Sequence, residues 1–167
     1  MDGMLERLID WFALPQAGLS TVFVVAFVSA TLLPMGSEPA VFAYAKLNPD
    51  HFWIVVAVAT AGNTLGGAVD YWIGYGAKEV IAKGRRTRYL VWFERLGPKA
   101  LFFSFLPVVG DPLCTVAGWL KLHFWSSVAW MAAGKFVRYT VMTGALLWVP
   151  DDWWRWLLSL LGWSGGA

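Results

Sequence analysis

Long apolar stretches follow one another along this chain, and prolines, glycines and acids interrupt them at two places. The stretch Leu19–Leu33 is apolar for 15 residues, which is shorter than the roughly 20 residues that a membrane-spanning helix needs. Phe52–Gly74 and Phe124–Val149 are each long enough to cross the hydrocarbon layer. The pattern predicts an all-α integral membrane protein in which long spans alternate with short, broken apolar segments.

Each interruption carries two prolines and one acid. The two segments read Leu33-Pro34-Met35-Gly36-Ser37-Glu38-Pro39 and Leu106-Pro107-Val108-Val109-Gly110-Asp111-Pro112. An offset of 73 residues relates three pairs of positions, which are Pro34 and Pro107, Glu38 and Asp111, and Pro39 and Pro112. An offset of 72 relates Ala61-Gly62-Asn63 to Ala133-Gly134-Lys135. A repeated, proline-broken apolar segment with a carboxylate is typical of the binding site of an inverted-repeat transporter.

Two short apolar arms flank each break, and this predicts one re-entrant hairpin in each copy. The arms are residues 19–33 and 40–47 in the first copy, and 100–106 and 113–120 in the second. Irregular backbone persists at membrane depth only where protein or a water-filled cavity covers it. The alternative for the first copy is a short tilted span over Leu19–Leu33, followed by a partly submerged loop.

The sequence therefore contains two copies of one unit, which consists of a surface helix, a hairpin and a span. We expect repeat one over residues 1–76, a basic connector over 77–88, repeat two over 89–150 and a C-terminal interfacial segment over 151–167. Amphipathic stretches open the repeats at Met4–Trp11 and Tyr89–Leu96. The predicted fold is an inverted repeat of amphipathic helix, re-entrant hairpin and transmembrane helix, with facing hairpins.

Composition supports the membrane assignment and excludes several classes of function. Hydrophobic residues make up 58% of the 167 residues and charged residues 14%, whereas a soluble domain carries about 25% charged residues. The net charge of +2 gives no nucleic-acid footprint, and a lone cysteine, Cys114, excludes an intrachain disulfide. Basic residues gather in residues 77–99, which places this loop on the cytoplasmic side.

Five ionisable residues fall at or near membrane depth, where charge is costly and usually functional. They are Glu38 and Asp111 at the breaks, Lys135 and Arg138 in the second span, and Asp70 near the end of the first. Two acids and two bases at the same depth favour pairing, since an unpaired charge in low dielectric costs several kcal/mol. Asp70, nearer the interface, is better explained by a structural role.

Small and helix-breaking residues accompany these charges. Helix packing explains most of the small residues, and the breaks explain the others; the residues are Pro34, Pro39, Gly62, Asn63, Gly66, Gly67, Pro107, Gly110 and Pro112. The sequence has no Ser/His/Asp arrangement, no His or Cys pair at metal spacing and no phosphate-binding loop. We therefore expect neither an enzyme nor a bound metal or cofactor.

Four motifs in order resemble the DedA family, also called VTT-domain or SNARE-associated membrane proteins, and within it the YqaA-like branch. The motifs are Ser29–Pro34 with Ser37-Glu38, Gly62–Gly67, Leu106–Asp111 with Ala117-Gly118-Trp119, and Gly134-Lys135 with Arg138-Tyr139. The region that they span runs roughly from Ser29 to Tyr139, which is most of the chain.

The resemblance implies two facing re-entrant hairpins, a place in the bacterial inner membrane and a role in moving lipids. It implies flipping of undecaprenyl phosphate or phospholipids, driven by protons, in envelope homeostasis, and it assigns the first-hairpin acid of the family to Glu38. The family pattern also has arginines three residues before and after the second-hairpin proline. Ser104 and Gly110 stand there in this chain, so the phosphate site is either relocated to Lys135 and Arg138 or built for a different substrate.

Two functional hypotheses follow, with a third kept beside them. In the first, a flippase or scramblase holds a lipid phosphate on Lys135 and Arg138, while Glu38, Asp111 and Asp70 relay protons. In the second, the charges only fasten the hairpins of a structural or scaffolding protein, and the basic loop binds anionic lipid or a partner. The third is a small-solute or ion transporter. Membrane lipids and protons are the expected partners, and oligomerisation stays open.

Overall fold

All regular structure in the described part of the chain is helical. The computed structural model describes residues 15–31, 36–76, 93, 95–106 and 109–149. The helices are α2 (Pro15–Thr31), α3 (Glu38–Leu47), η1 (Pro49–His51), α4 (Phe52–Gly76), η2 (Gly97–Phe105), α7 (Gly110–Trp119) and α8 (Phe124–Trp148). The predicted surface helix Met4–Trp11, the basic connector, Pro34, Pro107 and the C-terminal segment lie outside these residues.

Helical structure is interrupted at both proline-rich segments. α2 ends at Thr31 and α3 begins at Glu38, whereas η2 ends at Phe105 and α7 begins at Gly110. Pro39 lies in the first turn of α3 and Pro112 in the first turn of α7. Proline is tolerated there because the first N–H groups of a helix have no intrahelical partner. The sequence thus specifies where the second arm of each broken pair begins.

The helices after the two breaks have equal lengths and regular spacing. α3 and α7 each contain 10 residues, and α4 and α8 each contain 25. Glu38 and Gly110 begin the short helices, and Phe52 and Phe124 begin the long ones, so both pairs of starting residues are 72 positions apart. This is the offset that relates the motifs of the long apolar stretches.

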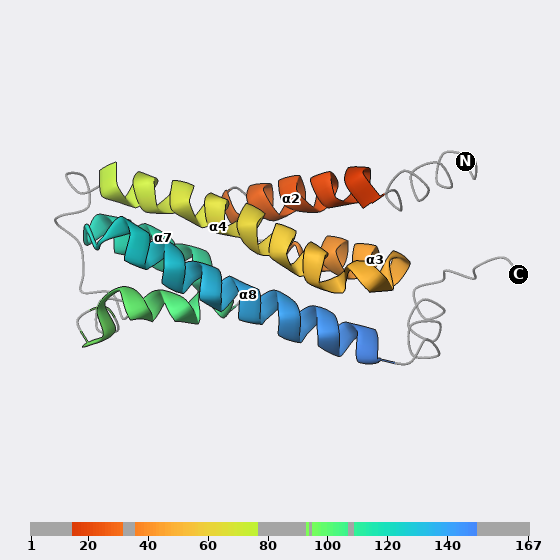
Figure 1. The fold of residues 1–167 in the computed structure, drawn as a ribbon. Helices are drawn as coiled ribbons and strands as arrows, with labels where there is room; N and C mark the ends of the chain where they lie inside the picture. Colours follow the sequence, from red (N-terminus) through yellow and green to blue (C-terminus); the bar gives the residue numbers. More distant parts are fainter. Residues whose placement is uncertain (1–14, 32–35, 77–92, 94, 107–108, 150–167) are drawn as a thin grey trace, which may run out of the picture.

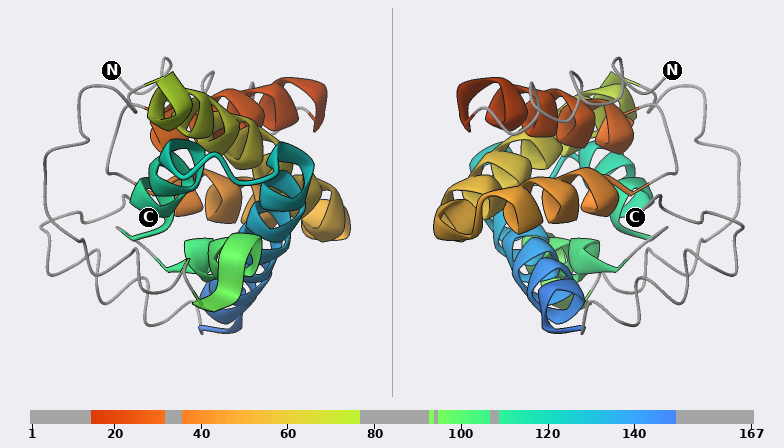
Figure 2. Two further views of the ribbon diagram at one scale, coloured as in Figure 1. Left: turned by 90° about the vertical axis from the view of Figure 1, so that its left-hand side faces the viewer. Right: turned by 90° about the vertical axis from the view of Figure 1, so that its right-hand side faces the viewer.

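The two long helices lie side by side and run in opposite directions, as Figure 1 shows. α2 and α3 lie together toward one end of the molecule, and η2 and α7 lie together toward the other, as Figure 1 and the end-on views of Figure 2 show. Within each broken pair the second helix runs back from the break toward the end at which the first began (Figure 1). Both breaks therefore lead toward the middle of α4 and α8.

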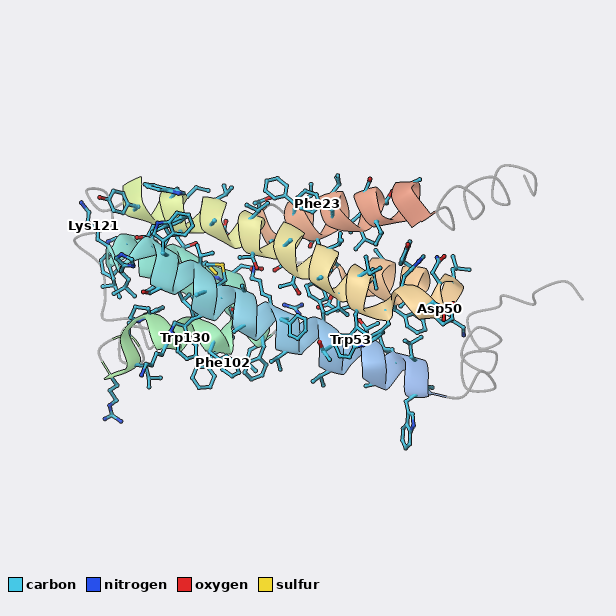
Figure 3. The ribbon with its side chains drawn as sticks, viewed as in Figure 1. Phe23, Asp50, Trp53, Phe102, Lys121 and Trp130 are labelled. Carbon is cyan, nitrogen blue, oxygen red and sulfur yellow. The ribbon has the colours of Figure 1, made fainter. Side chains whose placement is uncertain are left out.

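Glycines on the long helices allow close backbone contact with the first helix of each broken pair. A Cβ atom at Gly62 of α4 would lie 2.5 Å from the carbonyl oxygen of Phe23 on α2. A Cβ atom at Gly134, which is 72 residues later on α8, would collide with the carbonyl oxygen of Phe102 on η2. Phe102 also packs edge-on against Trp130 of α8, with ring centroids 6.4 Å apart (Figure 3). The repeated glycines thus fix equivalent contacts in the two halves.

Length and composition identify one membrane-spanning candidate among the described helices, the segment Pro49–Gly76. The second predicted span forms a helix of the same length, α8, but Lys135 and Arg138 in its middle make it less apolar. Outward faces of both helices are apolar, with exposed Leu65 and Ile73 on α4 and Val141 on α8. Such faces suit contact with lipid chains, which makes this all-helical fold compatible with a membrane protein.

Candidate functional site

The first acid–base pair joins the start of α3 to the middle of α8. Glu38 is the first residue of α3, and its Oε1 accepts a hydrogen bond from Arg138 Nε at 2.6 Å. Arg138 Nη2 contacts the same oxygen. The side chains are 10% and 14% exposed, so solvent screens the pair weakly. Oε2 of Glu38 lies against Gly36, in the space that a Cβ atom there would take.

The second pair lies one helical turn earlier on α8. Lys135 Nζ is 3.5 Å from Asp111 Oδ1 at the start of α7 and donates a hydrogen bond to the Asn63 carbonyl oxygen of α4 at 2.6 Å. A Cβ atom at Gly67 would lie 3.0 Å from the same ammonium. The missing side chain at Gly67 therefore makes room for the lysine. Lys135, from α8, bridges α7 and α4 through these two contacts.

Asn63 and Lys135 occupy equivalent places in the two copies. Each is the twelfth residue of its 25-residue helix, and 72 positions separate them. Their direct contact lies where the middles of α4 and α8 meet. The side-chain amide of Asn63 contacts a different helix: its Nδ2 donates a hydrogen bond to the carbonyl oxygen of Ala26 on α2 at 3.2 Å.

The predicted pairing of two acids with two bases is present, and the structure defines the partners. Lys135 is 1% exposed, whereas the Asp111 side chain is 41% exposed. The ammonium of Lys135 is therefore out of reach of a large substrate in this arrangement, and its predicted phosphate role stays a prediction. Arg138 is the more accessible base. Asp111 is the accessible acid, and solvent weakens its attraction to Lys135.

Asp70, which the sequence places toward the end of the first span, is buried in the helical bundle. It is on α4, seven residues after Asn63, and is 8% exposed. The charges of Asp111 and Lys135 both act on its carboxyl group. Asp70 thus belongs electrostatically to the second pair and extends it toward the C-terminal end of α4.

Small residues close the second break. A Cβ atom at Gly110 would collide with the carbonyl oxygen of Ser104, and Ser104 itself is 1% exposed. Ser104 Oγ also lies 2.9 Å from the place of a Cβ atom at Gly134. Ser104 and Gly110 are the two positions at which the DedA pattern has arginine, and this backbone has no room for a long side chain at either of them. The nearby positive charge comes from α8 instead.

A buried hydroxyl pair beside the first ion pair was not predicted. Ser37 Oγ and Tyr139 Oη share a short hydrogen bond, and the two residues are 2% and 1% exposed. Ser37 precedes Glu38, and Tyr139 follows Arg138. The available sequence signals were this adjacency to two charged residues and the place of Ser37 and Tyr139 in the motifs that resemble the DedA family.

Comparison with known proteins assigns the chain to a family. The inner membrane protein YqaA of Escherichia coli (strain K12) is 34% identical over 127 residues, which cover 76% of this chain and 89% of the relative. YqaA of Shigella flexneri matches with the same identity and coverage. An uncharacterised protein of Haemophilus influenzae is 38% identical over 133 residues, which cover 74% of this chain and 84% of the relative. No protein-family model and no solved structure matches the chain. On these similarities the chain belongs to the YqaA-type inner membrane proteins of the DedA family.

Proposed function

We propose that this protein moves phosphate-bearing lipids, either phospholipids or a polyprenyl phosphate such as undecaprenyl phosphate, across the inner membrane as a flippase or scramblase. The observation that carries the proposal is that the acid at each break forms an ion pair with a base in the middle of α8. Glu38 pairs with Arg138, and Asp111 pairs with Lys135. Ionisable residues at such a depth mark substrate or ion pathways in membrane proteins.

The topology proposed is an inverted repeat in which each broken pair is a re-entrant hairpin. Equal helix lengths, the common 72-residue spacing and the opposite directions of α4 and α8 support it. The broken pairs lie toward opposite ends of the molecule (Figure 1), as hairpins that enter from opposite faces would. With the basic loop 77–99 cytoplasmic, η2 and α7 enter from the cytoplasmic side.

Arg138 is the proposed contact for the lipid phosphate. A guanidinium stays charged and can hold phosphate oxygens bidentately, but Glu38 now occupies it. Protonation of Glu38 removes its negative charge and frees Arg138 for the phosphate. Release of the lipid and reionisation of Glu38 restore the ion pair. Asp111, through Lys135, plays the corresponding part at the second break, and no covalent chemistry is required.

A scaffold is the second candidate, and the burial of Lys135 favours it. A fully buried ammonium that joins Asn63 and Asp111 is what a purely structural staple requires. Buried ion pairs can specify packing without taking part in function. In this case the charges stabilise the fold, and neutralising them changes the stability of the protein and no other property.

Lipid transfer in liposomes separates the two candidates. Purified protein is reconstituted with a tail-labelled phosphatidylglycerol, or with a labelled polyprenyl phosphate, and transfer between leaflets is followed with and without a pH gradient. We expect wild-type protein to move lipid, and Arg138→Ala to lose transfer while still folding and inserting. Lys99→Ala removes an exposed charge on η2 and serves as the control that should transfer normally.

Each result has a defined consequence. Transfer that needs the gradient and disappears in Glu38→Gln supports a proton-coupled flippase, whereas gradient-independent transfer supports a scramblase. Unchanged transfer in Arg138→Ala contradicts the phosphate site. A well-folded wild-type protein that moves none of the lipids supports the scaffold.

A further inference from the structure

The second ion pair belongs to a cluster that contains more acid than base. Asp70 of α4 and Asp111 of α7 are its acids, and Lys135 of α8 is its base. The charges of Asp111 and Lys135 both act on the Asp70 carboxyl group. The first pair, by contrast, joins one acid, Glu38, to one base, Arg138. If all three groups of the second cluster are ionised, two negative charges meet one positive charge.

Asp70 is the member of this cluster that lacks a partner. It is 8% exposed, and within the described part of the chain its carboxyl group has no hydrogen bond and no ion pair. Asp111 is 3.5 Å from Lys135, and its side chain is 41% exposed. A buried carboxylate without a partner is costly and is normally neutralised by a proton. Burial and the excess of acid therefore both favour a neutral Asp70.

The groups that act on Asp70 come from α7 and α8. α2, which packs against the other side of α4, has no ionisable side chain. α7 carries Asp111 and the thiol of Cys114, which is neutral because it donates a hydrogen bond to a carbonyl oxygen at 3.3 Å. Glu38 of α3 is paired with an arginine of α8, and η1 lies at the opposite end of α4. Lys135 is thus the base nearest to both unbalanced acids in the described part of the chain.

The position of Gly67 brings Lys135 within reach of Asp70. A Cβ atom at Gly67 would lie 3.0 Å from Lys135 Nζ. Asp70 follows three residues later on the same face of α4, and side chains with this spacing have Cβ atoms about 5–6 Å apart. Because the lysine side chain is long and flexible, rotation about its bonds moves Nζ from Asp111 toward Asp70.

We propose that Asp70 and Asp111 bind one proton between them, and that the ammonium of Lys135 pairs with whichever of the two acids is ionised. In this structure the proton is on Asp70, and Lys135 pairs with Asp111. In the alternative arrangement Asp111 is neutral, and Lys135 pairs with Asp70. The change breaks an O–H bond on Asp70 and forms one on Asp111, so the charge of the cluster stays the same.

This inference rests on the proposed lipid transport only for the use of the proton. In that proposal Asp111 is neutralised at the second break, and a second acid then supplies a new partner for Lys135. The ammonium, which is 1% exposed, stays buried and paired in both arrangements. No second acid forms an ion pair with Arg138 among the described residues, so Arg138 is the base that becomes free for a lipid phosphate.

Infrared spectroscopy detects the proton on Asp70, because a protonated carboxyl group has a carbonyl stretching band that a carboxylate lacks. Full-length protein in dodecyl maltoside micelles is measured at about pH 6, where exposed Asp and Glu side chains are ionised. We expect Asp70→Asn to lose the band intensity of one protonated carboxyl group relative to wild type. Asp50→Asn removes an exposed acid on η1 and is the matched control that should keep the wild-type band.

Asp111→Asn tests whether the two acids share the proton. Lys135 then has Asp70 as its only acid partner in the cluster, so Asp70 should be ionised and the same band should disappear. Asp70→Asn removes the acid, whereas Asp111→Asn removes only its proton. An Asp70 that has no link to the second break would keep its band in Asp111→Asn.

The outcomes separate the proton site from the transport function. If Asp70→Asn has the wild-type spectrum, Asp70 carries no proton and the proposal is wrong. If Asp111→Asn retains the band, the shared site is wrong. Lipid transfer is measured with wild-type protein from the same preparation after reconstitution in liposomes. A protein that gives the expected spectra and moves no lipid contradicts the proposed transport and supports the proton site.

Discussion

The ion pair between Glu38 and Arg138 makes a quantitative prediction that two neutral substitutions can test. Glu38→Gln removes the negative charge and keeps the shape of the side chain, whereas Arg138→Gln removes the positive charge and leaves a shorter polar side chain. Either substitution alone leaves the partner charge in a setting where the two side chains are 10% and 14% exposed. The double substitution leaves two neutral amides in the same space.

The structure sets the scale of the expected effect. At the 2.6 Å separation of Arg138 Nε and Glu38 Oε1, the attraction is about 6 kcal/mol with an effective dielectric constant of about 20. Desolvation of the two charges offsets much of this, but removing one partner of a buried pair still costs roughly 3–5 kcal/mol. We therefore expect each single variant to lose roughly 3–5 kcal/mol of unfolding free energy. The double variant should lie much closer to wild type.

Unfolding in detergent micelles by titration with SDS, followed by tryptophan fluorescence, measures the three variants against wild type. Non-additivity of about 3 kcal/mol or more between the two substitutions is the expected coupling. Lipid transfer is measured on the same preparations. The transporter predicts that the double variant is stable and inactive, whereas a scaffold predicts no deficit beyond that in stability.

Additive effects would refute this reasoning. If each single substitution costs less than about 1 kcal/mol and the double variant equals their sum, the pair behaves as an exposed surface ion pair. The proposal that Glu38 controls access to Arg138 would then lose its structural basis.

Further predictions concern the second pair and helix packing. Asp111→Asn should cost less stability than Glu38→Gln in the same SDS titration, because the Asp111 side chain is 41% exposed and solvent screens its attraction to Lys135; an equal or larger loss would contradict this. Gly118→Ala should lower stability by roughly 1–3 kcal/mol, since a Cβ atom there would collide with the backbone of Tyr71 on α4. Gly144→Ala is the matched control in thermal unfolding, because no atom lies within 4 Å of its Cβ position; equal melting temperatures for the two variants would contradict the α4–α7 packing.

The breaks and long helices could be predicted from sequence because backbone chemistry determines them locally. Proline removes a backbone donor and restricts the helix before it, so α3 begins at Glu38, next to Pro39. The length of an apolar run limits the length of a helix, and α4 and α8 differ from the predicted spans only at their ends. These features need no knowledge of distant contacts.

The partners in the site could not be predicted, because they depend on how each helix is rotated. Lys135 and Arg138 are three positions apart on one side of α8, so the sequence alone does not show which acid each of them faces. The contact of Lys135 with a backbone carbonyl has no side-chain signature at Asn63. Ser37 and Tyr139 are 102 residues apart, and packing of α3 against α8 brings them together.

The difference between the two ion pairs bears on how a repeated structure could move a lipid. The motifs place one acid at each break, yet Glu38 is nearly covered and Asp111 is partly exposed. In a protein with two copies related by sequence, the two breaks can alternate: the acid of one break is covered while the acid of the other is exposed, and then the reverse. In the proposed transporter, this arrangement is then the one in which the second break is open and the first is closed. The opposite arrangement would expose Glu38 and bury Asp111, and Arg138 would become available for phosphate when its partner acid meets solvent and takes up a proton.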